Sequence, residues 1–110
     1  MQSGMEFAEI YPPMAESFFD LVFDLLEEGD HLVLEIAVPG VLETDIDITI
    51  EGSRLVIRAE RPAAAGPFLH SEIKRGILFR DISLPCAVEL LMSRYEDGVL
   101  RLQLKRLEAP

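Results

Sequence analysis

The chain has 110 residues, a length that suits one domain with a single buried core. Hydrophobic residues make up 49% of it and charged residues 27%, which is typical of a globular protein and not of a disordered one. Ten Lys and Arg against twenty Asp and Glu give a net charge of −10, which opposes binding to nucleic acid and to anionic membrane surfaces. No run approaches the roughly 20 apolar residues that span a bilayer.

The start of the chain, MQSGMEFAEI, lacks a basic stretch followed by an apolar run, so we expect no secretory signal. Cys86 is the only cysteine, which fits a reducing cytoplasm. Further on, apolar residues including Met14, Phe18 and Leu21 recur at helical spacing, and Gly29 stands where a helix would stop. This spacing predicts a helix over residues 14–22 and leaves residues 23–26 open.

From residue 31 onward apolar residues recur at every second position, which predicts β-strands. The first of these strands ends at Pro39-Gly40. The second carries Ile46, Ile48 and Ile50 on one face and polar residues on the other, and Gly52-Ser53 supplies a two-residue turn to the next. Residues 62–67 (PAAAGP) predict a loop.

The second half of the chain continues the alternation. Residues 68–72 suit a short extended piece, and a strand over residues 78–84 ends at Pro85. Asp97-Gly98 lies between two alternating runs and is a strong hairpin signal. Short strands without an intervening crossover helix predict an all-β fold, an antiparallel β-sandwich.

Arg80 stands out because its place on a strand suits an apolar residue. Period two puts it on one face with Leu78, Ile82 and Leu84. An unpaired guanidinium on a buried face costs several kcal/mol. We therefore predict that Arg80 pairs with a carboxylate inside the domain or lies against a second chain, unless the strand twists it to solvent.

The sequence offers no arrangement of groups for catalysis. His31 and His70 lack metal-ligand spacing, and Cys86 has no histidine nearby, so an inert thiol is the simpler interpretation. The carboxylates within residues 45–51 alternate with isoleucines, which indicates a solvated strand face and not a calcium loop. We expect no enzyme activity, no cofactor and no metal.

Five short motifs occur together in this order and resemble the α-crystallin domain of small heat-shock proteins. They are Pro39-Gly40-Val41, Glu60-Arg61, Arg80, Leu84-Pro85 and Gly98-Val99-Leu100. Arg80 ends a run that the family writes Gly-x-Phe-x-Arg, and Leu78 stands here in place of the Phe. The resemblance covers residues 24–106 and implies an immunoglobulin-like sandwich there. Residues 1–23 would then form a short helical or flexible arm, and residues 107–110 a C-terminal remnant.

The resemblance implies an ATP-independent holdase chaperone, which binds partly unfolded proteins and prevents their aggregation. Such proteins expose apolar surface and unpaired strand edges, and a chaperone answers with apolar surfaces of its own. An alternative on the same fold is an adaptor or co-chaperone module that binds one folded partner. Aromatic and aliphatic residues of the arm are candidates for client binding, or else for packing on the sandwich: Phe18, Phe19, Val22 and Phe23.

The resemblance also implies a homodimer. In family members from bacteria, archaea and plants, the loop after Glu60-Arg61 carries a short strand that pairs with the partner subunit. Phe68 matches the aromatic residue of that strand, and Glu72 an acidic residue just after it. Arg80 would then lie at or beside the dimer interface, with Glu72 or another loop carboxylate as its partner. Whether the loop exchanges between subunits stays open.

The family has a groove that receives an Ile-x-Ile or Ile-x-Val segment from the tail of another chain. Its candidate lining residues, each equally suited to the core, are Ile46, Ile48, Ile50, Leu91 and Met92. After Leu104 this sequence continues with Lys105-Arg106 and has no Ile-x-Ile motif. We therefore expect a homodimer with only weak further assembly, and clients that are non-native proteins.

Overall fold

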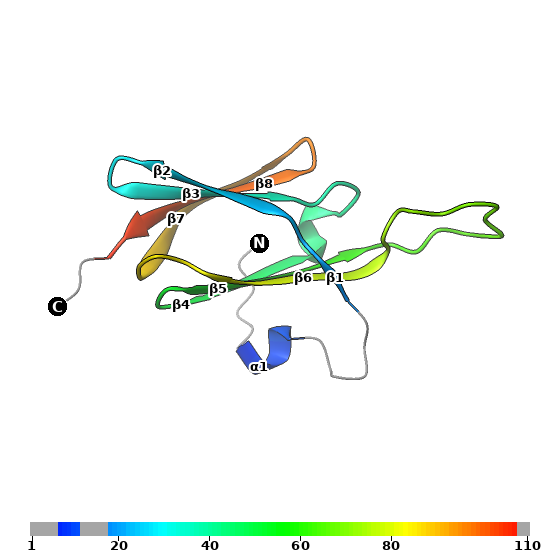
Figure 1. Ribbon diagram of the computed structural model, residues 1–110, viewed down its shortest axis with the longest axis horizontal. Coiled ribbons are helices and arrows are strands. Elements are labelled where there is room, and N and C mark those ends of the chain that lie inside the picture. The colour runs from blue at the N-terminus through cyan, green and yellow to red at the C-terminus, as the bar shows by residue number, and fades with distance from the viewer. Residues whose placement is uncertain (1–6, 12–17, 108–110) are drawn as a thin grey trace.

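The computed structural model describes residues 7–11 and 18–107, which form two four-stranded sheets packed face to face (Figure 1). The strands are β1 (Phe19–Asp20), β2 (Phe23–Glu28), β3 (His31–Ala37), β4 (Ile46–Glu51), β5 (Arg54–Arg61), β6 (Gly76–Ser83), β7 (Val88–Glu96) and β8 (Val99–Arg106). One sheet has the order β1-β6-β5-β4 and the other β2-β3-β8-β7. Only the β1–β6 pair is parallel. The predicted all-β, immunoglobulin-like antiparallel sandwich is confirmed.

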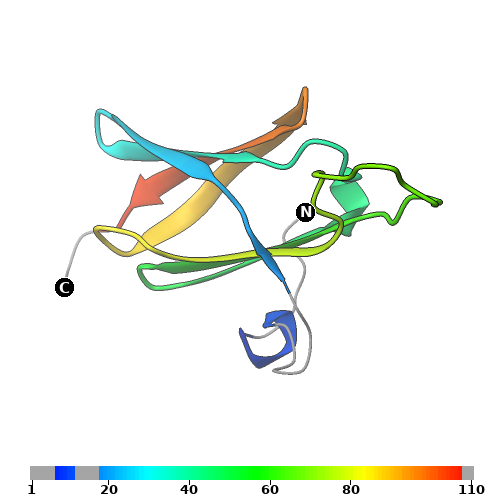
Figure 2. The same cartoon turned by 45° about the vertical axis from the view of Figure 1, so that its right-hand side comes forward.

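The core lies between the two sheets, which face each other in Figure 2. It is built from the inward positions of each alternating strand, such as Leu34, Ile57 and Leu102, which are fully buried. Period two sends neighbouring side chains to opposite faces, so each strand contributes every second residue. The alternation seen in the sequence is therefore the pattern that closes this core.

Two tight turns fix the strand register. Gly52 has a φ of +62° in the two-residue turn between β4 and β5, where the sequence predicted it. Asp97 and Gly98 have φ of +54° and +78° between β7 and β8. Positive φ at both central positions matches the hand of a twisted hairpin. A Cβ on Gly98 would also stand 3.0 Å from Pro39 Cα, so only glycine fits this close approach.

The helix predicted over residues 14–22 is wrong for the residues that the structure describes, while residues 14–17 lie outside them. Phe19–Asp20 form β1 beside β6, and β2 begins at Phe23. The chain passes from one sheet to the other at Leu21, so neighbouring apolar residues serve different sheets and not one helical face. Backbone pairing on both sides outweighs a short local helical pattern.

A short helix, α1 (Phe7–Ile10), lies beneath the sheet that contains β5 and β6 (Figure 1). A 3₁₀ turn (Glu43–Asp45) leads into β4. In the two described ranges, no helix is long and apolar enough to cross a membrane.

Candidate functional site

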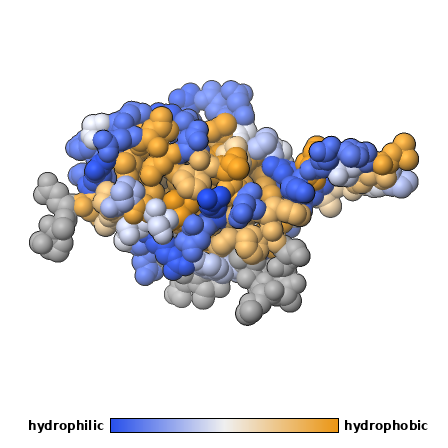
Figure 3. Space-filling view, viewed as in Figure 1, coloured by the Kyte–Doolittle hydropathy of each residue, from blue (hydrophilic) through white to orange (hydrophobic). Residues whose placement is uncertain are grey.

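The loop of residues 62–75 projects from the end of the β5–β6 hairpin, away from the sandwich (Figures 1 and 2). Phe68, with 52% of its surface exposed, Leu69 and Ile73 all face solvent. The outer end of this loop is visibly hydrophobic in Figure 3. Glu72 lies 2.6 Å from His70, from Oε2 to Nε2, and residues 68–72 belong to no strand in the single chain. The loop therefore presents apolar side chains to any second polypeptide.

Arg80 lies on the inward face of β6 together with Leu78 and Ile82, as the sequence predicted. Its Nη1 donates a hydrogen bond to the Leu21 carbonyl oxygen at 3.1 Å. The guanidinium carbon lies 4.9 Å from the centroid of the Phe23 ring, a cation–π contact. Across the described part of the chain, no carboxylate lies within ion-pair distance of it. Arg80 thus fastens the crossing from β1 to β2.

The candidate groove residues separate into two groups. Ile46 and Ile48 are 2% and 1% exposed and belong to the core between the sheets. Ile50 is half-buried against the same core. Leu91 and Met92 are exposed on β7, where the register shifts at a bulge between Leu90 and Met92. Because β4 and β7 are both edge strands, Ile50 lies at one sheet edge and Leu91 and Met92 at the other.

The four candidate arm residues also divide. Phe19 and Phe23 are half-buried and pack against the core cluster. Phe18 rests its ring edge-on against Phe79 with centroids 5.3 Å apart, and Val22 is exposed. Packing on the chain's own sandwich therefore accounts for three of them, and Val22 is the one that offers most of its surface to solvent.

A pocket at the base of the projecting loop is a feature that the sequence analysis missed. It has a volume of about 480 Å³ and is lined by Pro39, Gly40, Arg61, Ile73, Lys74 and Arg75. Arg61 is held by the carbonyl oxygens of Pro39 and Lys74, at 2.9 and 2.5 Å. Arg61 thereby links the base of the loop to the segment around Pro39. Because these residues are distant in sequence, no local sequence pattern predicts the contact.

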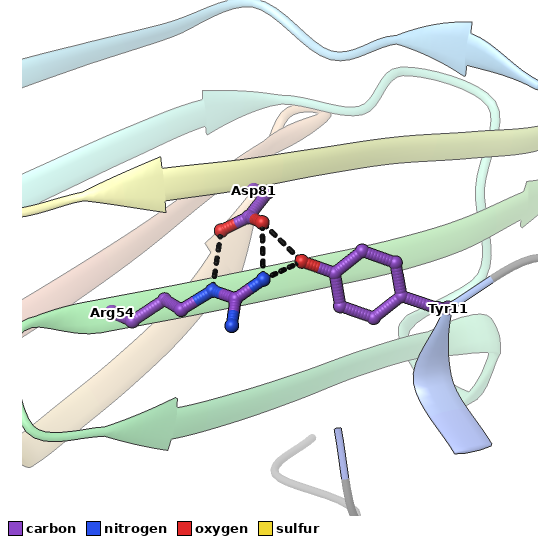
Figure 4. Close-up of polar contacts among 3 residues, drawn as sticks. All are labelled: Tyr11, Arg54 and Asp81. Carbon is purple, nitrogen blue, oxygen red and sulfur yellow. Dashed lines mark hydrogen bonds and ion pairs between the residues drawn. The ribbon is translucent and has the colours of Figure 1, made fainter. Parts of the chain in front are cut away.

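The outer face of β5 and β6 is a second feature that the sequence analysis missed. Tyr11 projects from the end of α1 between Arg54 and Asp81 (Figure 4). Arg54 donates to Asp81 through Nε at 3.0 Å and through Nη2 at 2.7 Å. Arg54 also donates to the Tyr11 hydroxyl oxygen, and that hydroxyl donates to Asp81 Oδ2.

This contact changes the proton affinity of two groups. The hydrogen bonds from Arg54 hold the pKa of the Asp81 carboxyl below its usual range. Burial, followed by the hydrogen bond to Asp81, raises the pKa of Tyr11 above its usual range. The contact is therefore made between a carboxylate and a neutral phenol over the whole neutral pH range.

These surfaces have the chemistry of binding. In residues 7–11 and 18–107, no group of three or more His, Cys, Asp or Glu side chains is placed to hold a metal ion. Large apolar side chains reach solvent on the loop and on the edge strand β7, among other places. Such surfaces suit contacts with other polypeptides.

The fold defines an immunoglobulin-like β-sandwich with a projecting loop, and solved structures share it. Heat shock protein 16.0 from Schizosaccharomyces pombe aligns with a TM-score of 0.76 at 20% identity, covering 88% of this chain and 73% of that one. HSP18.5 from E. histolytica aligns with a TM-score of 0.72 at 18% identity, covering 84% and 92%.

The sequence narrows this class to a family. Residues 24–110 match the Hsp20/alpha crystallin family. The 18 kDa antigen of Mycobacterium leprae is 33% identical over 85 residues, which are 74% of this chain and 57% of that protein. The 18 kDa antigen 2 of Mycobacterium avium is 34% identical over 83 residues, or 72% and 60%. The chain thus spans less than two thirds of the length of these relatives. It belongs to the Hsp20/alpha crystallin family, the small heat-shock proteins.

Proposed function

We propose that this protein is an ATP-independent holdase chaperone, which binds partly unfolded proteins and keeps them from aggregating. The observation that carries the proposal is the exposure of large apolar side chains on a member of this family. They gather on the projecting loop, at Phe68, Leu69 and Ile73, and on the edge strand, at Leu91 and Met92. Partly unfolded proteins expose surfaces that such side chains can cover. In this function the protein binds its clients and breaks no covalent bond.

The experiment is aggregation of a heat-labile client followed by light scattering without nucleotide. Substoichiometric to equimolar amounts of the protein should suppress the scattering. If several unrelated clients aggregate at an unchanged rate, the protein is no holdase. We place this activity in the cytoplasm, because the only thiol, Cys86, is unpaired. The net charge of −10 argues against nucleic acid and anionic membranes as partners.

We also propose that the projecting loop builds a homodimer. Phe68 would contact the partner subunit, and Glu72 would approach Arg80 across the interface. Two observations support this: Phe68 is exposed, and among the described residues Arg80 forms no ion pair with a carboxylate. An ion pair there would add to the contacts that Arg80 already makes.

Size-exclusion chromatography with light scattering tests the dimer. Phe68→Ser should weaken it, whereas Leu42→Ser, a matched change at an exposed apolar residue of a different turn, should leave it unchanged. Arg80→Ala should weaken it by about 2–5 kcal/mol, because a carboxylate is left unpaired. A dimer affinity untouched by Phe68→Ser and Arg80→Ala would refute this placement. A monomer at every concentration would favour an adaptor module with one folded partner.

The groove that we propose for an Ile-x-Ile segment of another chain lies between the two neighbouring edge strands, with Ile50 on β4 and Leu91 and Met92 on β7. Its support is the exposure of Leu91 and Met92 beside the bulge on β7. A synthetic peptide with that motif should bind the protein, and Met92→Glu should weaken its binding. Met92→Leu serves as the control that keeps the apolar surface. Equal binding to both variants would exclude the groove.

A further inference from the structure

The outer face of the β5–β6 pair carries apolar residues where an antiparallel sheet usually meets water. Val56, Ile77 and Phe79 point away from the main core and form a separate cluster with Ile10. Val56 and Ile10 are both fully buried. Ile10 and Tyr11, near the start of the chain, cover the cluster: Ile10 is part of it, and Tyr11 packs against it. We call Val56, Ile77 and Phe79 the outer patch.

The covering segment is short in the part of the chain that the structure describes. It is a helix of four residues, far too short to be stable alone in water. Ile10 inserts into the patch, and the Tyr11 ring lies 4.9 Å from that of Phe79, tilted by 56°. Arg58 Nη1 reaches the Ile10 carbonyl oxygen at 3.5 Å. Among the described side chains, Ile10 and Tyr11 hold this segment, and Phe18 lies edge-on against the same Phe79 ring. Because so short a helix depends on such contacts to stay in place, weakening them should release it.

The sheet side of this contact stays formed when the segment leaves. Arg54 and Asp81 stand on neighbouring strands and hydrogen-bond to each other directly, at 3.0 and 2.7 Å. Tyr11 joins a pair that already exists (Figure 4). Opening therefore uncovers an apolar floor with a preformed pair of one donor and one acceptor group at its edge. That combination matches an aliphatic residue followed by an aromatic one, as in Ile10–Tyr11.

We propose that the outer patch is a docking site for aliphatic–aromatic segments of non-native proteins, and that Ile10–Tyr11 is its built-in competitor. The proposal rests on the holdase function and adds a location and a control to it. The aliphatic side chain of the client lies on Val56 and Ile77, and its aromatic ring lies against Phe79. Backbone or hydroxyl groups of the client take the place of the Tyr11 hydroxyl at Arg54 and Asp81.

Competition between this segment and a client lowers the apparent affinity of the patch for the client, which can be measured. A site that its own cover occupies in about nine molecules of ten binds an external ligand about tenfold more weakly than the open site. Removing the cover should therefore raise the apparent affinity for a non-native chain by about that factor. Removing only the Tyr11 hydroxyl, and with it the hydrogen bonds to Arg54 and Asp81, should raise the apparent affinity by less.

The test measures binding of reduced, carboxymethylated α-lactalbumin, which stays unfolded without heating, to the 110-residue chain by fluorescence anisotropy. The covered form is the wild type, and the uncovered form is Ile10→Ser/Tyr11→Ala. Tyr11→Phe keeps the ring and loses the hydroxyl, so its affinity should fall between the two. Val56→Thr/Ile77→Thr, added to the uncovered form, removes apolar surface while keeping β-branched residues on both strands, and should abolish the gain. Far-UV circular dichroism checks that each variant is folded, and Tyr11→Ala alone replaces the double variant if that one unfolds.

The outcomes are distinct. An uncovered form that binds the probe no better than the wild type overturns the proposal. A gain in affinity that persists after Val56→Thr/Ile77→Thr also overturns it. If the wild type suppresses client aggregation and uncovering changes nothing, the holdase function stands and this site falls. If neither form binds the probe or suppresses aggregation, both fall. A concentration-dependent wild-type mass that Tyr11→Ala abolishes, with no gain in probe binding, would assign the patch to Ile10–Tyr11 of a second copy and overturn the proposal.

Discussion

At the scale of single residues, Arg80 shows how a charge is accommodated on an apolar face. Its guanidinium donates to the Leu21 carbonyl oxygen and stacks on Phe23, so both its polar edge and its flat face are used. Hydrogen bonds that involve a charged group contribute about 1.5–3 kcal/mol. The contact fixes the segment where the chain leaves one sheet for the other.

Arg80→Ala should therefore loosen that crossing. Two backbone hydrogen bonds flank it, from Leu21 N to the Phe79 oxygen and from Ala37 N to the Val22 oxygen. We expect hydrogen exchange at the Leu21 and Ala37 amides to speed up by about tenfold or more. Amides in the centre of β8 should keep their protection, and equal acceleration everywhere would show a global effect instead.

The pH dependence of the Tyr11 contact follows from Asp81. Its pKa in the folded state is lowered, chiefly by the Arg54 hydrogen bonds, so its contribution to stability is present above the ordinary Asp pKa of about 3.9. That contribution is lost as the pH falls through the lower folded pKa. Tyr11 has the opposite sign: its raised pKa keeps the contact up to about pH 10 and loses it as the pH rises further.

Chemical denaturation of the wild type and of Asp81→Asn between about pH 6 and pH 2 checks the acid limb. The wild type should be the more stable protein at the upper end, and the difference should shrink toward the lower end. A difference that stays constant across the range would mean that Asp81 does not titrate as its hydrogen bonds require.

The face of the strand occupied by Arg80 was predictable from period two alone, and its contacts were not. Alternation fixes which side of a sheet a residue takes, because the geometry of a strand allows only two. A carbonyl oxygen such as that of Leu21 carries no sequence signal, since every residue has one. The same limit hid the Tyr11–Arg54–Asp81 contact, whose members lie on three separate elements.

At the scale of elements, the two tight turns differ in their surroundings. A Cβ on Gly98 would stand 3.0 Å from Pro39 Cα, whereas one on Gly52 would meet nothing within 4 Å. Both have positive φ, so alanine strains either by about 1–2 kcal/mol. Only Gly98 adds a clash with another part of the backbone.

Gly98→Ala should therefore lower the free energy of unfolding by about 2–4 kcal/mol, and Gly52→Ala by about 1–2 kcal/mol. Urea denaturation of the two variants at equal protein concentration measures the difference. Equal losses would mean that Pro39 moves aside without cost.

Strands with strict alternation and a glycine turn were predictable because the alternation and the turn residues both indicate the same hairpin. The helical spacing over residues 14–22 misled because, in its described part, residues 18–22, neighbouring apolar residues belong to two sheets in succession. The burial of the outer patch was not predictable either. The strand pattern places Val56 on the outward face, where a residue usually meets water, yet Ile10 covers it. Only a tertiary contact from distant residues decides whether an outward position is wet.

At the scale of the whole molecule, the sandwich divides its apolar surface into three sets. One is buried between the sheets, one is covered by the start of the chain, and one is exposed, with members on the loop, on the β7 edge and elsewhere. The sandwich was predictable from the alternating strands, and the family from five short motifs that stand in the right order and spacing. The exposed set was not fully predictable, because the course of the loop depends on no local pattern.

The central claim is that exposed apolar surface on this sandwich captures non-native proteins without ATP. The most direct measurement heats a labile client with an equimolar amount of the protein and follows light scattering, then sizes the soluble fraction. We predict suppressed scattering and a soluble complex that contains the client, both reduced for Phe68→Ser/Ile73→Ser and both retained for the matched control Leu42→Ser. Undiminished scattering with the wild type, and no client in the soluble complex, would contradict the account.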